Sequence, residues 1–202
     1  MGSRMKELNE ALFLLINVSD HPSAVLLTIA KLLADYAIWL VPLALSIGWL
    51  RGSDSTRKLM LEATASGFAG LLIAQAIGLV WQHPRPFMIG LGQTLIPHAA
   101  DSSFPSDHLT LIWAVAFSFL MHQRPRFAGA FLALLGLLMA WARIYLGVHF
   151  PLDMLGAAVV AGISAWLCFR EEKWFVNRVF AWTTAIYRRI FAPLIRRGWV
   201  RE

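Results

Sequence analysis

Three short polar islands interrupt an apolar chain, and their residue types are suited to chemistry. They are Arg85-Pro86, Pro105-Ser106-Asp107-His108 and Arg143-x5-His149-x3-Asp153. Arginine guanidinium groups match the geometry of phosphate oxygens, and a histidine beside a carboxylate can transfer a proton or act as a nucleophile. Because polar groups beside lipid are costly and usually functional, the islands predict a membrane enzyme that acts on a phosphorylated lipid.

The composition also indicates a membrane protein of one domain. Of 202 residues, 58% are hydrophobic and 15% are charged, nine are Trp, and the mean hydropathy is +0.60. Soluble domains carry about 25% charged residues, so this chain has too little charge to cover a surface that faces water. The single cysteine, Cys168, lies in an apolar run and excludes an internal disulfide.

Five apolar stretches predict an all-α, polytopic helix bundle. They are residues 23–50, 60–81, 108–122, 127–147 and 152–169. Several approach the ~20 residues that an α-helix needs to cross a bilayer. The stretch 108–122 is short, and we expect it to extend back through Pro105-Ser106-Asp107 as its first turn.

The positive charges predict the orientation of this bundle. Thirteen of the 18 Lys and Arg residues lie in the 51–58 loop, in the 123–126 loop or after the last stretch. Cytoplasmic segments of membrane proteins carry such an excess. We therefore expect the N-terminus outside, the C-terminus in the cytoplasm and all three islands on the outer face. The same distribution accounts for the net charge of +6, so no nucleic-acid partner is expected.

Both ends of the chain are expected to lie at membrane interfaces. Residues 6–18 place four apolar side chains on one helical face, namely Leu8, Leu12, Leu15 and Ile16. Residues 172–191 form a basic amphipathic pattern within a cytoplasmic tail, 172–202, that suits an anionic leaflet. Residues 1–4 resemble an expression-vector remnant, and 5–202 are expected to form a single integral-membrane domain.

The islands gain expected roles from the helix ends on which they lie. Ser106 and the free backbone N–H groups at the start of the third stretch form an anion cradle. Pro151 suits the first position of the fifth stretch, which puts Asp153 in its first turn, within reach of the His149 ring. Each residue alone has a plainer interpretation, such as an interfacial anchor or a helix cap. Their shared side and converging helix ends favour one common site.

The islands resemble the signature of the type 2 phosphatidic acid phosphatase family, in its integral-membrane branch, which is related to vanadium haloperoxidases. That signature reads Lys-x6-Arg-Pro, Pro-Ser-x-His and Ser-Arg-x5-His-x3-Asp. This chain carries Gly78-x6-Arg85-Pro86, Pro105-Ser106-Asp107-His108 and Ala142-Arg143-x5-His149-x3-Asp153. The match covers residues 78–153 and implies a haloperoxidase-like active-site core.

The resemblance implies a phosphohistidine mechanism. His149 would attack phosphorus, Asp153 would orient His149, and His108 would protonate the leaving group and later activate water. The residues expected to hold the phosphoryl oxygens are Arg85, Ser106, Arg143 and Asp107. No metal or other cofactor is expected, because arginines replace it and the outer loops hold no dense carboxylate cluster.

Two departures from the signature concern positions 78 and 142. Gly78 stands where the family has a phosphate-binding lysine, and Ala142 replaces a serine. Lys31 is a candidate replacement cation, although Asp35 lies one helical turn later and an intrahelical ion pair is the plainer interpretation. Two loop histidines that could touch a second phosphate, or be ordinary loop residues, are His83 and His98.

Within the family, the amino-acid sequence at 83–87, 104–108 and 144–153 resembles that of the bacitracin-resistance type of undecaprenyl-diphosphate phosphatase. This implies an enzyme of the bacterial inner membrane whose active site faces the periplasm. It would remove the terminal phosphate of the polyprenyl diphosphate carrier that peptidoglycan synthesis reuses, and so confer bacitracin resistance.

Other functions remain open. Within the class they are a phosphatidylglycerophosphate or diacylglycerol pyrophosphate phosphatase and a lipid A phosphotransferase. Outside it they are a structural adaptor and a transporter or channel, which predicts polar residues spread through the spans.

Overall fold

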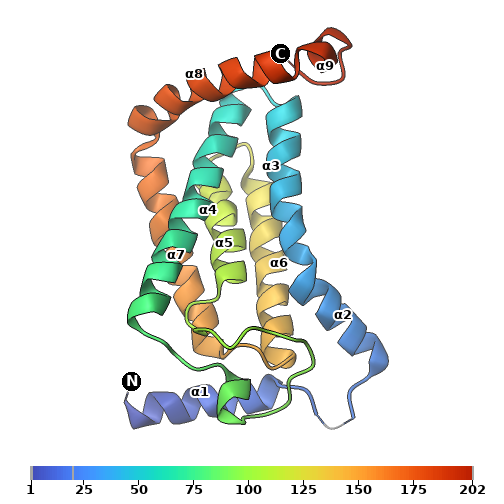
Figure 1. Cartoon of the computed structure of the whole chain (residues 1–202), viewed down its shortest axis with the longest axis vertical. Coiled ribbons are helices and arrows are strands. Elements are labelled where there is room, and N and C mark those ends of the chain that lie inside the picture. The colour runs from blue at the N-terminus through green and yellow to red at the C-terminus, as the bar shows by residue number, and fades with distance from the viewer. Residues whose placement is uncertain (1, 20, 202) are drawn as a thin grey trace.

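The computed structural model describes residues 2–19 and 21–201, apart from the side chains of 172–175, and these residues form helices without any strand (Figure 1). The elements are α1 (Ser3–Ile16), α2 (Ala24–Asp35), η1 (Ala37–Trp39), α3 (Leu40–Arg51), α4 (Asp54–Val80), η2 (Pro86–Ile89), α5 (Asp107–Leu120), α6 (Arg126–Tyr145), α7 (Pro151–Arg170), α8 (Glu172–Ile190) and α9 (Ala192–Arg196).

Helix α5 lies at the centre of the bundle and packs against α4, α6 and α7. Small residues allow this close packing. A Cβ atom added to Gly70 of α4 would lie 3.0 Å from Thr110 Cγ2 of α5 and 3.1 Å from Ser164 Oγ of α7. Glycine therefore lets three helices approach at one level, as is common where helices pack in membranes.

Four helical segments are long and apolar enough to cross a membrane: Ala24–Arg51, Asp54–Val80, Arg126–Tyr145 and Pro151–Arg170. The first joins α2 and α3 through η1, where the helix bends. The fourth begins at Pro151, as the sequence predicts.

The short apolar stretch predicted at 108–122 is a helix, α5 (Asp107–Leu120), and it is shorter than the four long segments. Helix α5 has 14 residues, or about 21 Å at ~1.5 Å per residue, which is less than the ~30 Å of a hydrocarbon core. Its expected first turn through Pro105 is also absent, because Ser106 is still extended (ψ 118°) and helix begins at Asp107. Helix α4 instead begins six residues before the predicted 60, since Ser53 and Asp54 suit a helix N-terminus.

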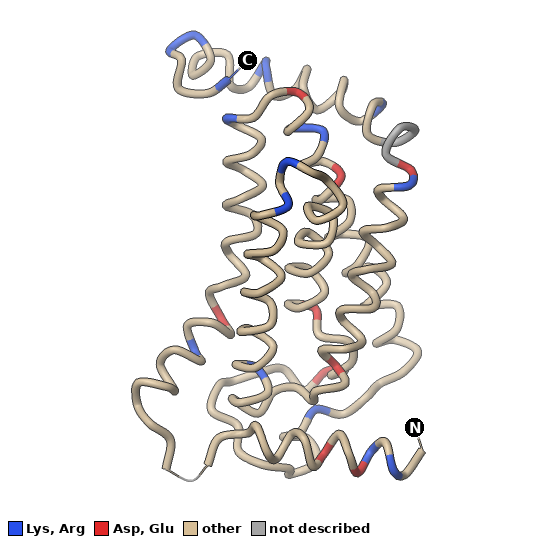
Figure 2. The backbone as a smooth tube through the Cα atoms, turned by 180° about the vertical axis from the view of Figure 1, so that it is seen from behind, with Lys and Arg blue, Asp and Glu red and all other residues tan. Residues whose placement is uncertain are grey.

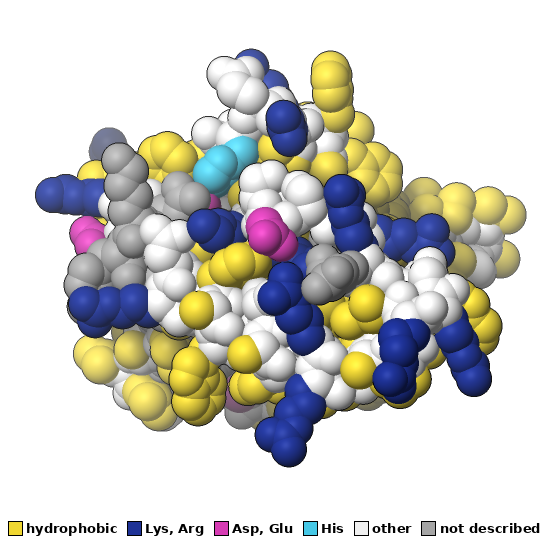
Figure 3. Space-filling view, turned by 90° about the horizontal axis from the view of Figure 1, so that it is seen from above, with side chains coloured by type: hydrophobic (Ala, Val, Ile, Leu, Met, Phe, Trp, Pro, Cys, Tyr) yellow, Lys and Arg dark blue, Asp and Glu magenta, His cyan; other side chains and the backbone are white. Residues whose placement is uncertain are grey.

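The two ends of the bundle differ in charge. Helices α8 and α9 lie across one end, and α1 and the 81–106 loop lie across the other (Figure 1). Lys and Arg gather at the α8 end (Figures 2 and 3). This matches the predicted asymmetry of the basic residues.

Helix α1 and the residue that follows it contact the loops that carry the islands through hydrogen bonds and an aromatic pair. Asn9 Oδ1 accepts a hydrogen bond from Leu152 N–H at the start of α7 (3.0 Å), and the Phe13 ring packs on Phe150 with centroids 5.3 Å apart. Asn17 Oδ1 accepts from Gln93 N–H at 2.7 Å. The opposite face of α1 exposes Leu8, Leu12 and Leu15. Asn9 and Phe13 thus support the islands, and three of the four apolar residues predicted to share a face point outward, whereas Ile16 packs against the core.

Candidate active site

The three islands meet at the α1 end of the bundle, each from a different helix end. The first follows α4, the second precedes α5, and the third joins α6 to α7. Gly147 turns the chain between α6 and α7 with φ +84°, a conformation that glycine adopts without steric cost. A Cβ atom there would also collide with Gln93 O. This turn brings His149 next to the first turn of α7.

His149 and Asp153 form a buried pair. His149 Nδ1 lies 3.2 Å from Asp153 Oδ2. The same oxygen accepts hydrogen bonds from Phe150 N–H at 2.7 Å and from Ser103 Oγ–H. Arg85 Nη1 lies 3.0 Å from His149 Nε2 and 3.4 Å from Nδ1. Because the Asp153 carboxylate accepts at Nδ1 and a guanidinium only donates, we assign the ring proton to Nδ1 and the lone pair to Nε2.

Arg85 is buried between the second and third islands. Nη1 donates to Val148 O at 2.9 Å, and Nη2 donates to Ser102 O at 3.2 Å. Nη2 and Nε also lie 2.8 Å and 2.9 Å from Asp101 Oδ1. The guanidinium therefore stands beside the lone pair of the expected nucleophile, His149.

Arg143 approaches the site from α6. Nη1 donates to Ala34 O of α2 at 3.2 Å, and Nη2 lies 3.0 Å from His98 Nε2. Its Nε is buried and makes no hydrogen bond in the described chain. Because His98 Nε2 accepts from Arg143, the ring proton sits on Nδ1, which points to Ala99 O at 3.2 Å. His98, the candidate contact to a second phosphate, is thus a neutral partner of an arginine.

His108 and Ser106 begin α5 beside these arginines. The half-buried His108 has Arg143, His98 and Arg85 as its electrostatic neighbours. Ser106 is completely buried, and its Oγ has no partner in the part of the chain that the structure describes. An unpaired buried hydroxyl is costly, which marks Ser106 as a donor available to a ligand.

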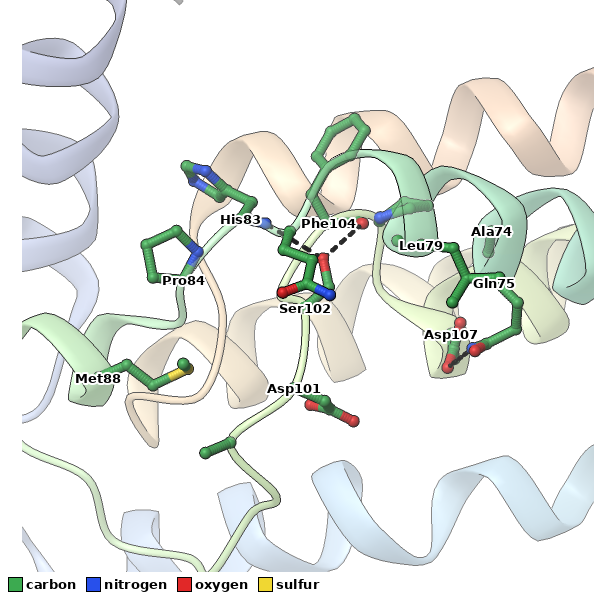
Figure 4. Close-up of a pocket in the computed structure, with 14 residues that line it drawn as sticks. Ala74, Gln75, Leu79, His83, Pro84, Met88, Asp101, Ser102, Phe104 and Asp107 are labelled. Atoms are coloured by element: carbon green, nitrogen blue, oxygen red, sulfur yellow. Dashed lines mark hydrogen bonds between the residues drawn. The ribbon is translucent and has the colours of Figure 1, made fainter.

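A polar cavity of about 340 Å³ lies between α4 and the second island. We call it the Gly78 cavity; Gln75, Gly78, Asp101, Ser102 and Asp107 are part of its lining (Figure 4). Asp107 turns into it and accepts a hydrogen bond from Gln75 Nε2 at 2.7 Å. A Cβ atom on Gly78 would lie 3.4 Å from Ser102 Cβ, an ordinary contact. The position of the missing lysine is therefore open space beside two carboxylates.

The remaining candidates lie at the edge of the site. Lys31 is exposed on α2, and no ion pair joins it to Asp35 within the described residues, contrary to the plainer interpretation above. The His83 ring packs near Trp81 and Phe150, at 5.6 Å and 5.8 Å between centroids. His83 thus shapes the loop through aromatic contacts.

The electrostatics of the site keep its loop histidines neutral. Burial, followed by the charges of Arg143 and Arg85, holds the pKa of His149 well below its usual value. Burial and Arg85 also lower the pKa of His98, and burial lowers the pKa of His83. A neutral His149 is the form that can attack an electrophile.

Sequence reasoning missed two residues of the site, Ser103 and Asp101. Ser103 donates to Asp153 across 50 positions, and Asp101 pairs with Arg85 across 16 positions. The only signal for either was its place in a loop between two islands, which does not specify a contact.

Comparisons with known proteins show what the chain as a whole is similar to. A sequence model described as the PAP2 superfamily matches residues 59–176. YbjG of Escherichia coli (strain K12) is 35% identical over 201 residues, which are 98% of this chain and 100% of that protein. The undecaprenyl-diphosphatase BcrC of Bacillus subtilis (strain 168) is 44% identical over 163 residues, or 81% and 83% of the two chains. The crystal structure of Aquifex aeolicus LpxE is similar, with a TM-score of 0.64, 27% identity and coverage of 81% and 95%.

Proposed function

The chain belongs to the PAP2 superfamily of membrane phosphatases, and we propose that it removes the terminal phosphate of undecaprenyl diphosphate. The observation that carries this proposal is the buried His149–Asp153 pair, whose free Nε2 faces an arginine at 3.0 Å. The name of BcrC supports the substrate, because that relative is an undecaprenyl-diphosphatase.

In the first step, the lone pair of His149 Nε2 attacks the terminal phosphorus. An N–P bond forms, and the bond from phosphorus to the bridging oxygen breaks. His108 protonates the departing lipid monophosphate. Asp153 holds the Nδ1 proton, which stabilises the charge that develops on the ring.

In the second step, water attacks the phosphohistidine. His108 takes a proton from the water, the N–P bond breaks, and its electron pair returns to Nε2. Inorganic phosphate leaves. In both steps Arg85, Arg143 and Ser106 donate to the phosphoryl oxygens, where negative charge must be stabilised. Two arginines thus supply the positive charge that a metal ion provides elsewhere.

The membrane arrangement that we propose has five crossings, with the N-terminus outside and the C-terminus inside. Helix α5 and the 81–106 loop together make the third crossing. The concentration of Lys and Arg at the α8 end supports this orientation. The active site then faces the periplasm from the bacterial inner membrane, where the carrier of peptidoglycan precursors would be recycled. Residues 5–202 act as one domain.

The test is phosphate release by the purified full chain in detergent, with a chelator present. Undecaprenyl diphosphate, phosphatidylglycerophosphate, diacylglycerol pyrophosphate and lipid A are offered separately. We expect the fastest release from undecaprenyl diphosphate. A glycerolipid or lipid A as the best substrate contradicts the carrier assignment, and a requirement for added metal contradicts the arginine-based mechanism. A transporter, a channel or an adaptor would release no phosphate from any of them.

A further inference from the structure

Every N–H group of the Arg85 guanidinium is already engaged within the protein. Nε–H and one Nη2–H meet Asp101 Oδ1, at 2.9 Å and 2.8 Å, and the other Nη2–H donates to Ser102 O. The two N–H groups of Nη1 meet Val148 O and His149 Nε2, at 2.9 Å and 3.0 Å. A guanidinium has five N–H donors. A phosphoryl oxygen can therefore reach Arg85 only when one of these partners withdraws.

Asp101 is the partner that can withdraw most easily. Val148 O and Ser102 O belong to the main chain, and His149 is held on its other side by Asp153. The Asp101 side chain is 61% exposed, and besides Arg85 it lies near the neutral His98 ring, with Nδ1 3.9 Å from Oδ1. Its displacement would break the fewest buried contacts.

The Asp101 carboxylate also resembles the ligand that Arg85 is expected to bind. It presents an anionic oxygen to two adjacent N–H groups of the fork, as a phosphoryl oxygen would. It lies at the border of the Gly78 cavity, which carries a second carboxylate, Asp107, and no lysine. The local charge thus opposes an incoming anion, although two arginines attract it.

We propose that Asp101 is the resting counter-anion of Arg85, which a phosphoryl ligand must displace to reach Nε–H and the outer Nη2–H of the guanidinium. It thereby weakens binding of the substrate and of both products by a similar factor, and speeds product release. This inference rests on the proposed function.

The opposite role would be that Asp101 holds Arg85 in place. The two roles predict opposite changes when the charge is removed without a change of shape, as in Asp101→Asn. If Asp101 competes with ligands for Arg85, removing its charge tightens the binding of inorganic phosphate, of orthovanadate and of substrate. If Asp101 instead orients Arg85, removing its charge weakens the binding of all three ligands and slows turnover.

The experiment measures inhibition of undecaprenyl diphosphate hydrolysis by inorganic phosphate and by orthovanadate, with the lipid monophosphate quantified by chromatography. In Asp101→Asn we expect both inhibition constants and KM to fall about two- to fivefold, as suits a partly exposed ion pair. Asp101→Glu keeps the charge and should stay near the wild type. Glu171→Gln is the matched control, because Glu171 is 63% exposed and faces Arg170 at the opposite end.

Unchanged or higher inhibition constants in Asp101→Asn, with a melting temperature near that of the wild type, would overturn the inference. So would a fall of the same size in Asp101→Glu. Failure of the proposed function looks different, because the wild-type chain itself would then release no phosphate from undecaprenyl diphosphate.

Discussion

Among the described residues, two histidine–carboxylate pairs lie within hydrogen-bond distance, one at each end of the bundle. At the α1 end, His149 Nδ1 lies 3.2 Å from Asp153. At the α8 end, His122 Nε2 lies 2.9 Å from Glu62, which also accepts from Ser118 Oγ at 3.0 Å. Distance alone does not separate them.

The two pairs differ in how far the ring is exposed and in what its other nitrogen or its face contacts. The His149 ring is 2% exposed, and its other nitrogen meets Arg85. The His122 side chain is 24% exposed, and its ring packs edge-on against Phe169 at 5.4 Å. The first pair presents a lone pair where anions can bind, whereas the second ties α4 to the end of α5.

Two buried arginines, Arg57 at the α8 end and Arg143 at the α1 end, also differ in how fully the protein engages their donors. Arg57 is fully buried at the α8 end, where it donates to Trp49 O at 3.0 Å and to Arg201 O at 2.6 Å, below the Tyr187 ring. Arg143 is equally buried, yet its Nε has no partner within the described residues. Arg143 thus keeps a donor for a ligand, whereas polypeptide groups engage Arg57 and make it a link between segments.

The largest expected effect comes from removing each histidine in turn. His149→Ala should lower kcat by about 10⁴–10⁶-fold, the scale seen when a nucleophile is lost. His122→Ala should keep kcat within about twofold and lower the melting temperature instead, because Glu62 loses a buried partner. Phosphate release and thermal unfolding in detergent measure both. A similar loss of activity in the two variants would break the comparison.

The carboxylate partners of the two histidines, Asp153 and Glu62, should also differ in their effect on kcat, with the larger loss at Asp153. Asp153→Asn should lower kcat by about 10²–10⁴-fold, because the amide no longer fixes the Nδ1-protonated ring or stabilises its charge. Glu62→Gln should leave kcat near that of the wild type. Phosphate release under saturating substrate tests this, and an active Asp153→Asn enzyme would remove Asp153 from the mechanism.

Replacing the arginines by lysine should affect different quantities. Arg143→Lys should lower kcat/KM by about 10²–10³-fold, through the loss of a forked donor to the transition state. Arg57→Lys should reduce the melting temperature and leave kcat/KM almost unchanged. If Arg57→Lys lowered kcat/KM as strongly, the α8 end would be part of the catalytic machinery.

The smallest effect concerns pH. Because the pKa of His149 lies well below its usual 6.5, the nucleophile stays neutral as the pH falls through 6.5. The midpoint of the acid limb of kcat/KM, after correction for ionisation of the substrate, should therefore lie below pH 6.5. A limb centred at or above 6.5 would mean that the arginines and burial do not act on His149 as described.

Sequence reasoning reached the features that depend on local spacing. A histidine and an aspartate four residues apart, around a proline that begins a helix, define the His149–Asp153 pair, and the counts of Lys and Arg define the basic end. It missed the start of α5 at Asp107 and the contacts of Ser103 and Asp101. These depend on how the 81–106 loop folds over the bundle, because no periodicity constrains which loop side chain meets which arginine.

The most direct test is to locate the phosphoryl group during turnover. Hydrolysis of the phosphohistidine needs His108 as a base, whereas release of a lipid monophosphate needs less help from an acid, so His108→Asn should accumulate the intermediate. The variant is mixed with undecaprenyl diphosphate labelled in its terminal phosphate and quenched at alkaline pH. We predict label on the peptide that contains His149 and none on the peptide that contains His122. Label on another residue, or hydrolysis at the normal rate without labelled protein, would contradict the assignment of His149 as the nucleophile.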